Sequence, residues 1–263
     1  MELDHFQTRI QKAKQAIAEA EYILLGGGVG ISAAASILCS GKRFTDKFAP
    51  RIRHFSLNDM YASGLSAFPA QEDKWGFWAK LIRHTRYEAG PARLYKDLYS
   101  LINEKHYFVL TMTVDSQFEL AGFSSDKIFE VQGNYGKLQC AIGCHDRVYS
   151  TEILVMEMAE SVVDYKIPQE LIPKCPICGG EMLPNIRNNK NFVQDEKFFE
   201  LEALYKGFVL ESMSQKRLYI GLGVDRESLV ILKQDDPIGS EQNNRNMISF
   251  PEGIHETVSA LLK

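Results

Sequence analysis

The sequence lacks an excess of basic residues. It has 30 Lys and Arg against 34 Asp and Glu, which gives a formal net charge of −4. Proteins that bind nucleic acid or anionic membranes through charge present a basic surface, so neither kind of partner is expected here. The hydrophobic fraction of 45%, with 24% charged residues, suffices for a buried core and excludes disordered and collagen-like chains.

Long hydrophobic runs and a secretory leader are also missing. The longest apolar runs hold about five residues, far short of the ~20 that a membrane-spanning helix needs. Met1 is followed by Glu2 and Asp4 instead of a basic segment and an apolar core. The 5 cysteines of the 263-residue chain, an odd number without an export signal, fit poorly with a disulfide framework. We therefore expect a cytoplasmic protein with reduced thiols and a metal site.

Apolar periodicity predicts helices that alternate with strands. Helices are predicted over residues 3–20, 92–103, 196–206 and 252–262, and strands over 22–25, 107–111, 127–131, 217–220 and 246–250. This alternation predicts an α/β fold with a Rossmann-like, doubly wound parallel sheet. Residues 133–190 differ in texture, because they hold four cysteines and a proline-rich exit. We interpret 133–190 as a small inserted domain, and 1–132 with 191–263 as the sheet domain.

A glycine-rich turn, Gly26 to Ser32, joins the first predicted strand to a helix. Glycines at such a turn allow the backbone to approach a pyrophosphate, and the helix N-terminus supplies free N–H groups. The alternative is a turn that is tight for structural reasons alone. The acidic residue of a dinucleotide-binding fingerprint would lie near Asp46, but no strand is predicted before it. This disfavours an ordinary redox dehydrogenase.

Two cysteine pairs lie in the predicted insert. Cys140 and Cys144 are separated by three residues, and Cys175 and Cys178 by two, with Gly179 and Gly180 directly after. Two such knuckles are typical of a tetrahedral structural zinc site, so we predict these four as zinc ligands; the alternative is four free thiols. Cys39 stands alone and is interpreted as a small buried residue.

A third motif follows the strand predicted over 107–111. It runs from Thr111 through Thr113 to Asp115, where a doubly wound fold places ligand-binding groups at the carboxyl edge of its sheet. Asp115 has a second interpretation, as the N-cap of a helix over 116–121.

Together these motifs resemble the sirtuin family over essentially the whole chain. The resemblance rests on Gly28-Val29-Gly30-Ile31-Ser32, on Thr111 to Asp115 with Ala121-Gly122, on the residue before Gly133, on the two cysteine pairs and on Gly221-Leu222-Gly223. The chain is most similar to the microbial class M group. Ser40 to Phe44 replace the Pro-Asp-Phe-Arg segment of ordinary sirtuins, and Gln132 replaces their catalytic histidine.

The resemblance implies an NAD-binding domain with a zinc-binding insert and an acceptor bound between them. The cofactor-binding residues it implies are Gly28, Val29, Gly30, Ser32, Arg43, Phe44, Thr111, Gly221, Gly223 and Ser249. The catalytic residues it implies are Gln132, Asp115 and Thr113. Class M relatives are regarded as protein ADP-ribosyltransferases that act on a lipoyl-carrier protein, and this activity is expected here.

Two other functions stay open. An NAD-dependent protein deacylase is disfavoured because the amide of Gln132 cannot accept a proton near pH 7. A catalytically weak regulator that binds NAD or ADP-ribose is suggested by three changes from the family pattern, Val29 for Ala, Thr113 for Asn and Ser249 for Asn. Arg43 is interpreted either as a positive charge near the pyrophosphate or acceptor, or as an ordinary surface cation.

Overall fold

The computed structural model describes residues 2–37, 41–55, 68–188, 190–224, 247–250 and 253–263. Its central element is a five-stranded sheet in the order β3-β2-β1-β7-β8, and every neighbouring pair is parallel. The strands are β1 (Tyr22–Gly27), β2 (His106–Thr111), β3 (Ile128–Glu130), β7 (Arg217–Leu222) and β8 (Met247–Phe250). The predicted strands are thus confirmed, with ends that differ by one or two residues.

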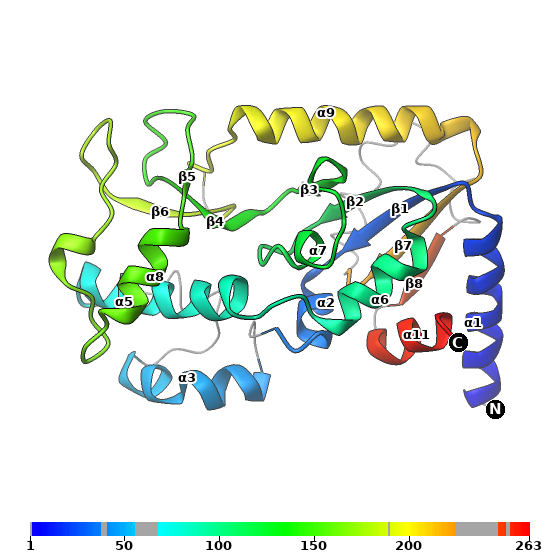
Figure 1. The fold of residues 1–263 in the computed structure, drawn as a ribbon, viewed down its shortest axis with the longest axis horizontal. Coiled ribbons are helices and arrows are strands. Elements are labelled where there is room, and N and C mark those ends of the chain that lie inside the picture. The colour runs from blue at the N-terminus through cyan, green and yellow to red at the C-terminus, as the bar shows by residue number, and fades with distance from the viewer. Residues whose placement is uncertain (1, 38–40, 56–67, 189, 225–246, 251–252) are drawn as a thin grey trace.

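Helices cover both faces of this sheet (Figure 1). One face packs against α1 (Glu2–Glu19), α2 (Val29–Ala34), α6 (Arg93–Ile102), α7 (Gln117–Leu120) and α11 (Ile254–Leu261), and the other against α9 (Glu196–Glu211). Ile23 and Leu25 of β1 belong to the first face, and Leu24 belongs to the second. A strand buried on both faces is apolar throughout, which explains the unbroken apolar run at its start. The doubly wound fold predicted from sequence is confirmed.

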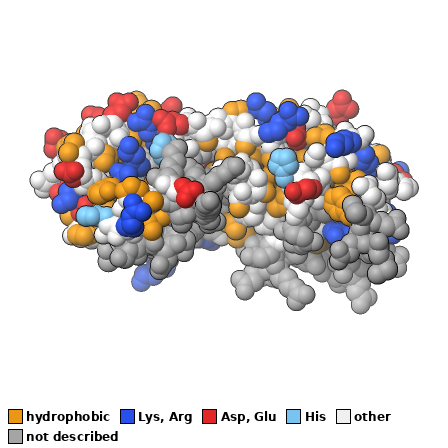
Figure 2. Space-filling model, turned by 90° about the horizontal axis from the view of Figure 1, so that it is seen from below, with side chains coloured by type: hydrophobic (Ala, Val, Ile, Leu, Met, Phe, Trp, Pro, Cys, Tyr) orange, Lys and Arg blue, Asp and Glu red, His pale blue; other side chains and the backbone are white. Residues whose placement is uncertain are grey.

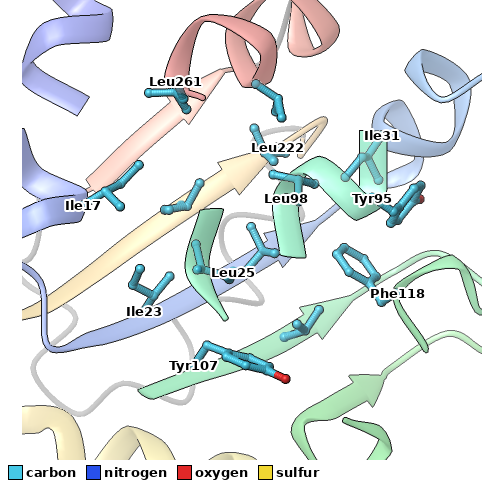
Figure 3. Packing of buried hydrophobic residues seen from close by; sticks show 14 of the residues in the cluster. Ile17, Ile23, Leu25, Ile31, Tyr95, Leu98, Tyr107, Phe118, Leu222 and Leu261 are labelled. Atoms are coloured by element: carbon cyan, nitrogen blue, oxygen red, sulfur yellow. The ribbon is translucent and has the colours of Figure 1, made fainter. Parts of the chain in front are cut away.

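The core on the first face joins the two ends of the chain (Figure 3). Helix α1 contributes Ile10, Ala13 and Ile17 at helical spacing, all at most 6% exposed. Ile17 of α1 and Leu261 of α11 belong to this core and the two helices contact each other, so the N- and C-terminal helices cover the same strands. Each large aliphatic side chain buried in this way contributes roughly 1.5–3 kcal/mol.

A second lobe contains an antiparallel sheet in the order β5-β4-β6. Its strands are β4 (Gly133–Cys140), β5 (Tyr149–Ser150) and β6 (Met182–Ile186), and α8 (Glu152–Glu160) lies beside them. The lobe's core also includes residues from α3 (Gly41–Phe55) and α5 (Gln71–Ile82), so it draws on chain before residue 132. In Figure 1 this lobe lies at the end opposite both termini. The domain boundaries at 132 and 191 stay a prediction.

Some helices differ from the sequence-based expectation. Helix α5 was not predicted, because Trp75 to Ile82 is buried almost all round and shows no polar face; a π-helix, η1 (Arg83–Tyr87), continues it. Helix α3 was also not predicted. Helix α9 reaches Glu211 instead of ending at Lys206. The 3₁₀ turns are η2 (Ser125–Lys127), η3 (Gln169–Leu171) and η4 (Ser212–Ser214).

Acidic and basic side chains are interspersed on the face shown in Figure 2. Among the residues that the structure describes, no helix has both the length and the apolar character needed to cross a membrane.

Candidate functional site

The carboxyl ends of the central strands lie in register along one edge. Gly27 pairs with Thr111 on one side and with Leu222 on the other, and Thr111 pairs with Glu130. Strands β2 and β3 lie on one side of β1, whereas β7 and β8 lie on the other. Open α/β sheets bind ligands outside the carboxyl ends at such a change of direction. The residues predicted after β1, β2, β3 and β7 therefore meet at one edge.

The two glycine motifs of this edge contact each other directly. The amide of Gly28 donates to the Leu222 carbonyl at 3.0 Å, and the amide of Gly30 donates to the Gly223 carbonyl at 3.3 Å. A Cβ on Gly28 would lie 2.0 Å from the Gly223 carbonyl oxygen, and one on Gly30 would lie 2.8 Å from the Gly223 Cα. Gly223 itself has a φ of 60°. Glycine is thus required at these positions by backbone packing, whatever ligand lies above them.

Ser32 and Asp115 are joined below this turn. The Ser32 hydroxyl donates to Asp115 Oδ2 at 2.6 Å and lies 3.1 Å from the Tyr95 hydroxyl. Asp115 Oδ1 accepts from the Gln117 amide at 3.2 Å, but the N-cap residue of α7 is Ser116, so the capping interpretation of Asp115 was wrong by one position. Burial raises the pKa of Asp115, while the bonds from Ser32 and Gln117 oppose the rise. Asp115 is 2% exposed and is held in one orientation.

Thr113 bonds to Thr111, two residues before it in the sequence. Its hydroxyl lies 2.9 Å from the Thr111 hydroxyl, and its amide donates to Thr111 Oγ1 at 3.0 Å. Thr111 Oγ1 in turn donates to the Gly27 carbonyl at 3.1 Å. Both threonines are buried, so this short chain of hydroxyl groups ties β2 to β1 at the predicted site.

Gln132 follows β3 on the same edge and is half-buried. Within the described residues its side-chain amide has no hydrogen-bond partner, whereas its carbonyl accepts from the Arg187 amide at 2.9 Å. The guanidinium of Arg187 donates to the Val131 carbonyl at 3.1 Å and stacks 4.7 Å from the Phe192 ring. Arg187 was missed by sequence reasoning, because it sits in a polar turn after β6 whose contacts with Val131 and Gln132 are set only by the fold.

The remaining predicted NAD-binding residues lie in β8, α2 and α3. Ser249 lies in β8 opposite Gly221, and its carbonyl accepts from Arg9 at 3.3 Å. Val29 is the first residue of α2 and is 55% exposed. Arg43 and Phe44 belong to α3, but their side chains lie outside the described residues.

The four predicted metal ligands gather in the second lobe. The sulfurs of Cys140, Cys144, Cys175 and Cys178 all lie within 4.8 Å of one another. Cys140 and Cys178 are 3.7 Å apart and Cys144 and Cys175 are 3.6 Å apart, measured between sulfurs. A zinc ion with bonds of about 2.3 Å has tetrahedral edges of about 3.8 Å, so these thiols fit zinc.

Groups around the sulfurs support the same interpretation. Burial alone would raise the pKa of Cys140. The backbone amides of Cys144 and Ile142 and the neighbouring thiols have the larger combined effect and lower this pKa to about 6. His145 Nδ1 lies 3.0 Å from the Cys144 sulfur, and its Nε2 lies 2.9 Å from the Tyr149 hydroxyl. Such outer hydrogen bonds orient metal ligands.

A polar cluster beside Asp115 was not found by sequence reasoning. Glu130, at the end of β3, accepts from Asn134 Nδ2 at 2.5 Å and from the Ser116 hydroxyl at 3.3 Å. Arg86 donates to the same hydroxyl. Burial raises the pKa of Glu130 to about 7, although Asn134, Arg86 and Lys137 oppose the rise. No spacing in the sequence links these residues, because they come from four separate elements.

Comparison with known sequences identifies two relatives, although no protein-family model matches the chain. A protein ADP-ribosyltransferase of Staphylococcus aureus is 29% identical over 223 residues, which cover 84% of this chain and 71% of the relative. A probable bifunctional ADP-ribose hydrolase/ADP-ribosyltransferase of Fusarium oxysporum is 25% identical over 242 residues, which cover 88% of this chain and 40% of the relative.

Solved structures show the fold. A mutant Sir2 homologue in complex with ADP-ribose has a TM-score of 0.59 at 17% identity, covering 95% of this chain and 94% of the other. Sir2Tm bound to a propionylated peptide has a TM-score of 0.59 at 17% identity, covering 96% and 97%. A Sir2 homologue in complex with NAD has a TM-score of 0.57 at 17% identity, covering 96% and 92%. The resemblance to sirtuins is confirmed: the chain has the Sir2 fold and is related in sequence to protein ADP-ribosyltransferases.

Proposed function

We propose that the chain transfers ADP-ribose from NAD to a side chain of a partner protein and releases nicotinamide. The observation that supports this most directly is Gln132, an amide at the edge position where sirtuins have a proton-accepting histidine. An amide aligns a ribose hydroxyl by hydrogen bonding but cannot remove its proton near pH 7. Deacylation needs that base, whereas transfer to a nucleophilic acceptor does not.

In the proposed reaction the bond between the anomeric ribose carbon and the nicotinamide nitrogen breaks. A bond from the acceptor atom to that carbon replaces it, and the acceptor's proton passes to solvent. The chain supplies position and electrostatic stabilisation. Asp115, which the Ser32 hydroxyl holds in place, would support the ribose pocket, and Thr113 would line it. Gln132 would orient a ribose hydroxyl by hydrogen bonding. The buried hydrogen bonds of Ser32 and Thr111 fit such a preorganised role.

NAD would bind as a substrate along the glycine edge, by which we mean the sheet edge formed by Gly28–Gly30 and Gly221–Gly223. Gly28, Val29, Gly30 and Ser32 would face the pyrophosphate together with Gly221 and Gly223, and Thr111 would lie beneath them. Arg43 and Phe44 would approach from α3, and Ser249 would hold the adenosine ribose. Zinc at the four cysteines would be structural, since four protein ligands leave no open position for substrate.

The acceptor we propose is a lipoyl-carrier protein. An open pocket of about 620 Å³ lies between the first cysteine knuckle and residues 190–194, and it is lined by polar groups such as His145, Asp146 and Lys190. Phe192 lines the same pocket and packs over Gly133, directly after Gln132. Phe192 thus links an open, polar surface pocket of the second lobe to the residue next to Gln132, and such a surface would suit a protein acceptor.

A second candidate, a regulator that binds NAD or ADP-ribose with little turnover, is favoured by Thr113. Its hydroxyl is engaged with Thr111, and threonine is shorter than the asparagine of the family pattern. Fewer contacts would then reach the nicotinamide ribose.

The test is a side-by-side incubation of labelled NAD with a lipoyl-carrier protein, an acetyl-lysine peptide and a native lysate. Transfer predicts a labelled protein and free nicotinamide in equal amounts. Robust deacetylation of the peptide by the unmodified chain would contradict the proposal. Measurable NAD binding with neither reaction would favour the regulator.

Two variants make this test specific. Gln132→Ala is expected to reduce labelling by on the order of 10²-fold while leaving the fold intact, as expected for loss of one positioned hydrogen bond in a transition state. Gln15→Ala, on the exposed face of α1, is the matched control and should label normally.

A further inference from the structure

The polar cluster around Glu130 connects the two lobes next to the proposed reacting edge. Arg86 comes from η1 and Asn134 from β4, both beside the second lobe's core, whereas Ser116 precedes α7 and Glu130 ends β3 of the central sheet. Arg86, Glu130 and Asn134 line one pocket of about 430 Å³, and the Ser116 hydroxyl bonds to all three of them.

Ser116 is the centre of this cluster. Its hydroxyl accepts from Arg86 and from Asn134 Nδ2, the latter at 2.6 Å, and donates to Glu130 Oε1 at 3.3 Å. Ser116 also has a φ of 59°, a left-handed conformation that a serine adopts only when its surroundings hold it there. The residue before it is Asp115, whose carboxyl binds Ser32. The three bonds to the hydroxyl therefore fix the turn that orients Asp115.

The space for Arg86 is built into the fold. A Cβ on Gly136 would lie 2.5 Å from Arg86 Nε, so the guanidinium can lie there only because residue 136 is glycine. The wide turn of the π-helix η1 brings Arg86 to this point, and π-helical turns are frequent at functional sites.

Both oxygens of Glu130 face hydrogen-bond donors. Oε1 accepts from Ser116 and Oε2 accepts from Asn134. A proton on Oε2 would face the Asn134 amide nitrogen, which can only donate. A proton on Oε1 would face the Ser116 hydroxyl, which already accepts from Arg86 and Asn134, so protonation disrupts one of these bonds in either case. The charged groups around Glu130 are Arg86 from η1, Lys137 from β4, Lys197 from α9 and Glu119 from α7.

We infer that Glu130 is a positioning residue of the proposed transfer site, holding the Asp115–Ser116 turn when ionised and releasing it when protonated. The inference rests on the proposed function, because it assumes that Asp115 lies at the NAD site. The pKa of Glu130, raised by burial to about 7, places this change in the neutral range. NAD affinity should therefore fall as the pH drops below 7.

The experiment is calorimetric titration of the full-length chain with NAD at pH 6 and pH 8.5, without acceptor. For the unmodified chain we expect binding about tenfold weaker at pH 6. Glu130→Gln should bind weakly at both pH values with a ratio near one. Glu119→Gln removes a carboxylate from the same pocket that has no hydrogen bond to Ser116 and is the smallest influence on the pKa of Glu130, so it should keep most of the tenfold ratio.

Ser116→Gly provides a second route if Glu130→Gln does not fold. Glycine keeps the left-handed turn but lacks the hydroxyl, so the pH ratio should again approach one while the melting temperature stays near that of the unmodified chain. A normal pH ratio in either folded variant would overturn the inference, as would loss of the ratio in Glu119→Gln.

The outcomes separate this inference from the proposed function. A labelled acceptor with a flat pH ratio in the unmodified chain would overturn the role of Glu130 alone. The expected ratio without labelling of any protein would support Glu130 and contradict transfer. Absence of NAD binding by the unmodified chain would overturn both.

Discussion

The cysteine cluster and the glycine edge are built on opposite principles. At the cysteine cluster four side chains within one lobe converge on one point, and their sulfurs lie within 4.8 Å of one another. At the glycine edge the contacts join backbone to backbone, between Gly28 near the N-terminus and Gly223 late in the chain. Side chains define the first site, whereas the absence of side chains defines the second.

This difference predicts how substitutions at each site affect stability and ligand binding. The cysteine cluster depends on a metal, so loss of one ligand removes a large binding free energy at once. The glycine edge depends on close packing, so a small side chain costs a moderate amount and affects ligand binding through displaced backbone.

The largest effect is expected at the metal site. Cys178→Ala should lower the zinc content from about one per chain to near zero and unfold the second lobe, because structural zinc contributes on the order of 10 kcal/mol. Metal analysis and thermal melting measure this. Cys39→Ala removes a thiol outside the four and should keep its zinc. A zinc-free chain of full stability would refute the assignment.

A smaller effect concerns the choice of reaction. Gln132→His alone should not produce deacylation of an acetyl-lysine peptide while Thr113 remains, because each missing contact costs on the order of 10²–10³ in rate, or about 3–4 kcal/mol. Gln132→His combined with Thr113→Asn should give the first measurable rate. Appearance of full activity in the single variant would show that Thr113 does not limit the site.

The glycine edge should show an intermediate loss of stability. Gly28→Ala places a methyl group against the Gly223 carbonyl and should lower the free energy of unfolding by about 3 kcal/mol, with weaker NAD binding. Gly207→Ala is the control, since a Cβ there has open space in helix α9 and should stabilise the chain slightly. Lost stability with unchanged affinity per folded molecule would make the turn purely structural.

Gly30→Glu adds a negative charge at the same turn, in addition to the backbone displacement that any side chain at this position causes. The longer, negatively charged side chain should abolish NAD or ADP-ribose binding through steric conflict and charge repulsion. Calorimetry on the folded fraction measures it, and unchanged binding would remove this turn from the site.

The contrast also explains what the sequence could predict. Cysteine spacing relates directly to a metal site, because Cys140 and Cys144 lie in one local turn, Cys175 and Cys178 lie in another, and the pairing of β4 with β6 brings the two turns together. The glycine turn between β1 and α2 was predicted from sequence, but its packing partner was not, since Gly28 lies against Gly223 and only the parallel sheet brings the two together. Arg86, Ser116, Glu130 and Asn134 gave no signal at all. Their hydrogen bonds connect four elements, and no periodicity or motif encodes such a meeting.

The smallest effect is a test of Glu130 by stability alone. Its pKa is raised from an ordinary 4.5 to about 7, so between these values the folded chain binds more protons than the unfolded chain. The free energy of unfolding should therefore fall as the pH rises from 4.5 to 7 and then level off. The Glu130→Gln variant lacks this slope. Its free energy of unfolding should therefore match that of the unmodified chain near pH 5 and exceed it at pH 8 by about 1–2 kcal/mol, allowing for partial exposure.

Urea unfolding at the two pH values measures the difference, with Glu119→Gln as the control that keeps the slope. A variant that is less stable at pH 8 would mean that the cluster stabilises the carboxylate. A more stable variant that binds NAD less well would instead show that the sheet edge retains Glu130 for its role in the site, in contrast to the cysteine cluster, where function and stability are lost together.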